Sequence, residues 1–126
     1  MSDAFDRPRV LIAEDETLLR MVAVEFLEEA GCAVIEAADG EQALECLKQN
    51  PDIKLLVSDI RMPRINGYQL VEQGLALRPN LKVLLMTGYT QDPVPEHLTS
   101  RGVVIIYKPF DEDRFVAMAR GMIATG

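Results

Sequence analysis

Polar side chains able to do chemistry follow four short apolar runs of the sequence. The acidic pair Glu14 and Asp15 follows one run, and Asp59, Thr87 and Lys108 each stand at the end of another. Three carboxylates that converge on one crevice repel one another, so such a cluster needs a positive counter-charge. A hard divalent cation would supply it, and Mg²⁺ fits best because it commonly takes one or two carboxylates and keeps waters or phosphate oxygens as its other ligands.

A carboxylate, a metal ion, a lysine and a hydroxyl group together suit phosphoryl transfer. The carboxylate of Asp59 can attack phosphorus to give an aspartyl phosphate. The metal and Lys108 would offset charge on the transferring oxygens, and Thr87 could donate its hydroxyl hydrogen to one of them. Each of these residues alone is more simply explained as a cap, a turn residue or a solvated side chain. Their combination at the ends of successive strands is what predicts a site.

Five predicted strands must bring these residues together. Short apolar runs, bounded by turn residues, alternate with longer segments whose apolar residues recur at helical spacing. A capping box at Asp39 and Gln42 and a hydrophobic staple of Phe110 and Phe115 around Asp111 mark two helix starts. The predicted strands are residues 9–13, 32–37, 54–59, 82–88 and 103–107.

Strands that alternate with helices imply a parallel sheet covered on both faces. Right-handed crossovers then predict an α/β fold with a doubly wound, five-stranded parallel sheet. Ligands of such sheets bind at the carboxyl ends of the strands, where the strand order reverses. Asp59 therefore ends a buried strand because this fold places its site there.

Composition and net charge indicate which classes of function are not expected. The chain has 126 residues, enough for one domain, and 20 acidic against 13 basic residues give a net charge of −7. Direct nucleic-acid binding is not expected, because phosphate contacts need a basic surface. No apolar run approaches the roughly 20 residues of a membrane span, and the start lacks a signal peptide, so a cytoplasmic location without membrane contact is expected. Cys32 and Cys46 form no CxxC pair and are expected to be reduced.

The motifs as a set resemble the receiver domains of two-component response regulators, the chemotaxis-regulator-like fold. The resemblance rests on "VLIAEDE", "VSDIRMPRINGYQL", "LLMTGY" and "YKPF", in this order and spacing. It covers essentially the whole chain, and implies a single receiver domain over residues 1–126 with a core of about 8–124. It also implies the flavodoxin-like strand order 2-1-3-4-5.

The resemblance assigns a role to each metal ligand. It implies Mg²⁺ bound by Asp15, Asp59 and the backbone carbonyl of Arg61, with Glu14 acting through a ligand water. Asp59 would be the phosphoacceptor. The implied activity is self-phosphorylation and dephosphorylation alone, so the chain is not expected to be an enzyme with a separate substrate.

The resemblance also implies a switch and its partners. Lys108 would pair with Asp59 or with the phosphoryl group, and the Lys108–Pro109 peptide would be cis. A histidine kinase or histidine phosphotransfer protein would donate the phosphoryl group. Thr87 would then move toward it and alter the surface of the last two helices and the fifth strand, where a downstream protein would bind.

The sequence departs from the receiver pattern at one position. Receivers usually carry a switch aromatic three residues before the lysine, where this chain has Ile105. Tyr107, next to the lysine, is expected on the opposite face of the strand by alternation. Tyr89, two residues after Thr87, is therefore the available switch aromatic.

The helix before Gly102 is expected to be short. Asp92 could cap it with Pro93 at its first position. Val94 and Leu98 are its clear apolar anchors, and a helix this brief is marginal without tertiary support. We expect it to be mobile, with few core contacts, and to become ordered on phosphorylation.

Two other functions share the same chemistry. The chain could be a phosphorelay intermediate or the receiver module of a hybrid histidine kinase instead of a stand-alone switch. An aspartyl-phosphate phosphohydrolase would share the nucleophile. Such enzymes generally place a second acidic residue two positions after it, and Arg61 occupies that position here, which disfavours this alternative.

Overall fold

A computed structural model describes residues 7–88 and 94–124, which fold around one parallel β-sheet. The spatial order of the strands is β2-β1-β3-β4-β5, and every neighbouring pair is parallel. This confirms the predicted doubly wound class and its strand order. The strands are β1 (Arg9–Ala13), β2 (Ala33–Ala37), β3 (Ile53–Asp59), β4 (Lys82–Thr87) and β5 (Val104–Tyr107).

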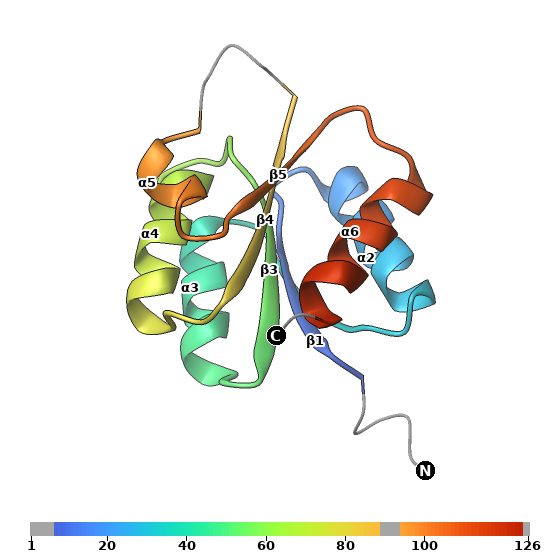
Figure 1. Ribbon diagram of the computed structural model, residues 1–126, viewed down its shortest axis with the longest axis horizontal. Helices are drawn as coiled ribbons and strands as arrows, with labels where there is room; N and C mark the ends of the chain where they lie inside the picture. The colour runs from blue at the N-terminus through green and yellow to red at the C-terminus, as the bar shows by residue number, and fades with distance from the viewer. Residues whose placement is uncertain (1–6, 89–93, 125–126) are drawn as a thin grey trace.

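Helices cover both faces of the sheet. Figure 1 shows the sheet nearly edge-on, with α3, α4 and α5 on one side and α2 and α6 on the other. No helix of the described ranges combines the length and apolar character that a bilayer crossing requires. The helices are α2 (Thr17–Glu29), α3 (Gly40–Gln49), α4 (Gly67–Leu77), α5 (Glu96–Thr99) and α6 (Glu112–Ala124).

Each face of the sheet has its own apolar core, which explains why the strands are nearly continuous apolar runs. Leu11 and Leu85 belong to the cluster on the α3, α4 and α5 side. Ile12 and Leu84, their neighbours in sequence, belong to the cluster on the α2 and α6 side. The central strands are therefore buried on both faces, and buried polar side chains gather at their carboxyl ends.

Side-chain caps fix where three helices begin. Asp39 Oδ1 accepts a hydrogen bond of 2.8 Å from the Gln42 backbone N–H, as the sequence predicted. Before α6, Asp111 Oδ1 accepts one of 2.7 Å from a backbone N–H, and the predicted staple is present as stacked Phe110 and Phe115 rings 5.2 Å apart. A capping box at Asn66 and Gln69, not expected from the sequence, starts α4.

The expected short helix is confirmed as α5, which has four residues. Its Leu98 is buried and Val94 packs against the same core cluster, so both predicted anchors are in place. Asp92 and Pro93, the predicted cap, lie outside the described residues. The mobility of this segment stays a prediction.

The expected orientation of Tyr107 is wrong. Val104 and Ile106 pack with the α2 and α6 cluster, whereas Ile105 packs with the opposite cluster. Side chains two residues apart on a strand share a face, so alternation assigns Tyr107 to the Ile105 side. Tyr107 is 49% exposed there, at the open end of the edge strand β5.

Candidate functional site

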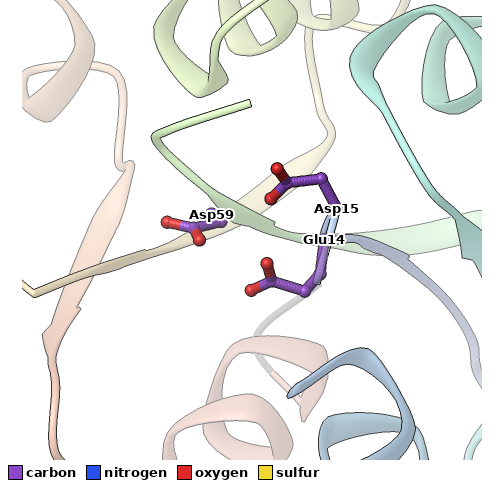
Figure 2. Close-up of side chains that lie close together, drawn as sticks. All are labelled: Glu14, Asp15 and Asp59. Atoms are coloured by element: carbon purple, nitrogen blue, oxygen red, sulfur yellow. The ribbon is translucent and has the colours of Figure 1, made fainter. Parts of the chain in front are cut away.

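Adjacent strands bring the three predicted carboxylates together. β1 and β3 pair in parallel with Ala13 opposite Ser58, so the residues that follow them leave the sheet side by side. One carboxylate oxygen from each of Glu14, Asp15 and Asp59 lies within 4.8 Å of the other two. Figure 2 shows Glu14 and Asp15 both directed toward the side on which Asp59 lies. The structure thus gathers the acidic cluster that the sequence predicted.

Glu14 is the most deeply buried member of the cluster, with 1% of its surface exposed. Its Oε2 accepts a hydrogen bond of 3.1 Å from the Glu16 backbone N–H. The pKa of Glu14 is raised to about 7, mainly by burial and also by the neighbouring Asp59 carboxylate, against the lowering effects of the Glu16 hydrogen bond and of Lys108. The charged form of Glu14 is therefore disfavoured unless a further cation lies nearby.

Asp59 lies at the centre of the site and is 9% exposed. Its Oδ1 accepts a hydrogen bond of 2.7 Å from the Ile60 backbone N–H. Its Oδ2 accepts one of 3.2 Å from Lys108 Nζ, which also lies 3.8 Å from Glu14 Oε1. One carboxylate oxygen is thus held by the backbone and the other by a cation.

Lys108 reaches the acidic cluster from the end of β5. Its backbone N–H donates a 2.7 Å hydrogen bond to the carbonyl of Thr87, which joins the ends of β5 and β4. The Lys108–Pro109 peptide is cis, as the receiver resemblance implied. Thr87 is itself buried at the end of β4. Both residues are therefore brought to the same end of the sheet as Asp59.

An open cleft of about 530 Å³ lies over these strand ends. Five of the predicted site residues line its wall, among them Arg61 from the loop between β3 and α4. Tyr89, the predicted switch aromatic, lies outside the described residues. The cleft is lined by Asp15, Glu16, Leu19, Asp59, Ile60, Arg61, Thr87, Gly88 and Lys108.

Two residues that shape this site were not identified from the sequence. A Cβ atom at Gly67 would lie 2.5 Å from the Asp59 carbonyl oxygen, so only glycine allows α4 to start this close to the end of β3. Arg20 of α2 donates a 2.8 Å hydrogen bond to the Glu14 carbonyl and another of 3.1 Å to Glu36 Oε1.

The donor set suits a hard divalent cation. Its ligand atoms are carboxylate oxygens from Glu14, Asp15 and Asp59, without nitrogen or sulfur, which is the chemistry that Mg²⁺ and Ca²⁺ prefer. Burial and the Asp59 carboxylate keep the pKa of Glu14 raised despite the nearby Lys108, so a further cation would stabilise its charged form. The residues present could therefore hold a metal ion.

Known proteins have this fold and are similar to the chain in sequence. The response regulator receiver domain family matches residues 10–120. The response regulator receiver protein CpdR of Brucella abortus is 34% identical over 103 residues, which cover 81% of this chain and 85% of CpdR. The sensor kinase CckA of the same organism is 30% identical over 90% of this chain, which spans only 12% of that kinase.

A solved structure agrees with these sequence relatives. The receiver domain from the hybrid histidine kinase CckA superimposes with a TM-score of 0.78 at 33% identity, and covers 91% of this chain and 98% of that domain. Such receivers are signalling modules that accept a phosphoryl group. The chain belongs to the response regulator receiver domain family and is a phosphoacceptor switch of two-component signal transduction.

Proposed function

We propose that Asp59 accepts a phosphoryl group from a histidine kinase or a histidine phosphotransfer protein in a Mg²⁺-dependent reaction. The observation that carries this proposal is the contact of Lys108 Nζ with Asp59 Oδ2, 3.2 Å, inside a cluster of three carboxylates. Lys108 would offset charge on the transferring oxygens, and a metal ion held by the carboxylates would supply further positive charge there. The cleft over the strand ends gives a donor access to it.

The proposed metal ligands are the carboxylates of Asp15 and Asp59 and the backbone carbonyl of Arg61, with Glu14 acting through a ligand water. Support comes from the shared position of the three carboxylates and from Arg61 in the cleft wall. When bound, Mg²⁺ supplies positive charge to the acidic cluster and to the phosphoryl oxygens. Three residues of this chain would then act on the reaction directly.

In the proposed step, an oxygen of Asp59 forms a bond to phosphorus as the phosphorus–nitrogen bond of a donor phosphohistidine breaks. The leaving imidazole nitrogen keeps the bonding electron pair and takes up a proton. Lys108 stabilises the negative charge on the transferring oxygens, and the Thr87 hydroxyl donates a hydrogen bond to one of them. Hydrolysis of the aspartyl phosphate later resets the switch.

The proposed output is protein binding through the surface of α5, β5 and α6. Thr87 is hydrogen-bonded through its carbonyl to Lys108, so a movement of Thr87 would reach the end of β5 directly. The proposed domain is residues 1–126, with a core of about 8–124. A cytoplasmic setting is supported by two free cysteines, Cys32 and Cys46, which suit a reducing compartment.

A second candidate is a phosphorelay intermediate or the receiver module of a hybrid histidine kinase. It is favoured by the likeness to the sensor kinase CckA and to the receiver domain from the hybrid kinase of that name. The two candidates differ in where the phosphoryl group goes. A relay receiver returns it to the histidine of a phosphotransfer protein, whereas a terminal switch keeps it until hydrolysis.

Incubation of the purified chain with a small phosphodonor and Mg²⁺ tests the central proposal. Intact mass should show one added phosphoryl group, labile to acid and to hydroxylamine, and Asp59→Asn should remove it. Asp52→Asn, at an exposed residue, is the matched control and should label normally. A stable, acid-resistant phosphate on Ser58 or Thr87 would overturn the assignment.

A further inference from the structure

Arg64 holds an unfavourable backbone conformation at the tip of the loop between β3 and α4. Its φ angle is +67°, in the left-handed region, and the Ile65 backbone N–H donates a 2.8 Å hydrogen bond to the Pro63 carbonyl. A hydrogen bond between residues two apart, around a central residue of positive φ, is the pattern of the rare and strained γ-turn. Residues with a Cβ atom keep such a conformation only when their surroundings hold it.

The side chain of Arg64 supplies such a hold by bridging to the start of α3. Its Nη2 lies 3.1 Å from Asp39 Oδ2, and its Nε lies 3.1 Å from Glu41 Oε1. Asp39 also caps α3, because its other oxygen, Oδ1, accepts a hydrogen bond from the Gln42 backbone N–H. One guanidinium group thus ties the loop tip to a rigid helix end that lies more than twenty residues away in sequence.

The backbone beside Arg64 is packed against the same helix end. A Cβ atom added at Gly40 would lie 2.8 Å from the Ile65 Cβ atom and 2.8 Å from its carbonyl oxygen, so loop and helix are already in close contact. At the base of the loop, the Gly67 backbone N–H donates a 2.7 Å hydrogen bond to the Ile60 carbonyl. The loop that carries Arg61 is therefore closed at its base and tethered at its tip.

We propose that Arg64 is a positioning residue for the Mg²⁺ and phosphoryl site: through Asp39 and Glu41 it holds the strained loop that presents the Arg61 carbonyl. This inference rests on the proposed function, because it assumes that the loop contributes to cation binding. Arg64 is 67% exposed, and exposed ion pairs add little to global stability. We therefore expect Arg64 to affect the position of the loop and not the free energy of unfolding, so its effect is measured through Mg²⁺ binding.

Electrostatics alone makes the opposite prediction. Arg64 is a positive charge three residues beyond Arg61, so its removal should strengthen the binding of a divalent cation to nearby carboxylates. Loss of positioning should weaken it. The sign of the change in Mg²⁺ affinity thus separates the two effects without reference to catalysis.

Calorimetric titration of the unphosphorylated chain with Mg²⁺ gives this measurement. We expect Arg64→Met to weaken binding by about tenfold, the lower range for residues that orient metal ligands. Arg64→Gly, which adopts a positive φ without strain and so folds readily, should also weaken it, because the tether is lost. Arg9→Met, which removes an arginine paired with Asp52, is the charge-matched control and should not weaken it.

A double variant sharpens the test. Asp39→Asn keeps a good helix cap but removes the charge that Arg64 contacts. If only net charge mattered, combining it with Arg64→Met would return Mg²⁺ affinity to the wild-type value. Positioning predicts that the double variant binds as weakly as Arg64→Met alone, since Arg64→Met has already broken the contact with Asp39. In the absence of metal, amide exchange at Ile65 should be faster in Arg64→Met, Arg64→Gly and the double variant than in the wild-type chain.

The outcomes are distinguishable from failure of the proposed function. If the wild-type chain binds no Mg²⁺ at the acidic cluster, the proposed metal dependence and this inference both fall. If the wild-type chain binds Mg²⁺ and Asp15→Asn abolishes binding, while Arg64→Met binds as tightly as wild type or more tightly, then only the role of Arg64 is overturned.

Discussion

Lys108 Nζ lies 3.2 Å from Asp59 Oδ2, although Lys108 follows β5 and Asp59 ends β3, and these strands are not neighbours in the sheet. β4 lies between these strands, and the hydrogen bond from the Lys108 N–H to the Thr87 carbonyl fixes the end of β5 against it. The lysine can therefore reach across one strand to Asp59. A single cation near two carboxylates leaves the site short of positive charge.

The first prediction distinguishes the role of Lys108 from that of the metal ion. Lys108→Met should lower the rate of labelling of Asp59 by a small phosphodonor by about a hundredfold, the scale of losing one electrostatic stabiliser in a transition state. The same change should tighten Mg²⁺ binding, since a competing positive charge is removed. Lys48→Met, at an exposed lysine of α3, should change neither quantity. Equal labelling rates in Lys108→Met and wild type would show that the lysine is not part of the reaction.

The second prediction concerns the metal itself. Labelling of Asp59 should stop in excess chelator and return when Mg²⁺ is restored, because Glu14, Asp15 and Asp59 share one small region without enough positive charge. Asp15→Asn should weaken Mg²⁺ binding in calorimetry, while Asp52→Asn should not. Undiminished labelling in chelator would rule out the proposed metal dependence.

The third prediction is a pH dependence that comes from Glu14. Its pKa rises from 4.5 in an unfolded chain to about 7 in the fold, so the native state binds a proton more tightly. Below pH 4.5 both states are protonated and Glu14 has no effect on stability. Between pH 4.5 and 7 the unfolded state loses its proton first, so the free energy of unfolding falls by about 3 kcal/mol as pH rises.

Glu14→Gln removes this dependence. In metal-free buffer, urea unfolding should give similar stabilities for variant and wild type near pH 4.5. At pH 8 the variant should be more stable by up to about 3 kcal/mol. A stability difference that does not grow with pH would mean that the fold does not raise the pKa of Glu14.

The fourth prediction tests why α4 can begin beside Asp59. Gly67→Ala would place a Cβ atom 2.5 Å from the Asp59 carbonyl oxygen, which is rigid backbone. We expect it to destabilise the fold by about 1–3 kcal/mol, the usual cost of overpacking, and to slow labelling of Asp59. Gly121→Ala in α6 meets nothing within 4 Å and should instead stabilise the fold slightly. Thermal unfolding of both variants makes the comparison.

Local patterns account for what could be predicted from the sequence. Each strand and its terminal polar residue lie next to each other in the chain, so the parallel order of the strands was enough to bring Glu14, Asp15 and Asp59 together. The ion pair of Arg64 with Asp39 was not predictable, because it joins residues from two different loops whose distance depends on side-chain packing. Tyr107 was assigned to the wrong face by an error in strand alternation.

The short length of α5 was predicted from local sequence, but its stability depends on a few long-range contacts. Leu98 is 1% exposed and forms its main anchor in the core. The His97 Nε2 atom lies 2.6 Å from Glu72 Oε2 of α4, on the surface, where such pairs contribute little. Four residues of helix with one buried anchor should open easily, because little apolar area is lost on opening.

The last prediction is that phosphorylation orders this segment. Backbone amides of α5 and its flanks, residues 94–101, should exchange quickly in the unmodified chain and more slowly with a phosphoryl mimic bound, because a phosphate contact can order a switch segment. Amides of α3, which has four buried residues, should exchange slowly in both forms. Tyr89→Ala should blunt the slowing if Tyr89 is the switch aromatic, and Tyr107→Ala should not. If residues 94–101 are as protected as α3 in both forms, the switch does not operate through α5, and β5 and α6 become the surface to test.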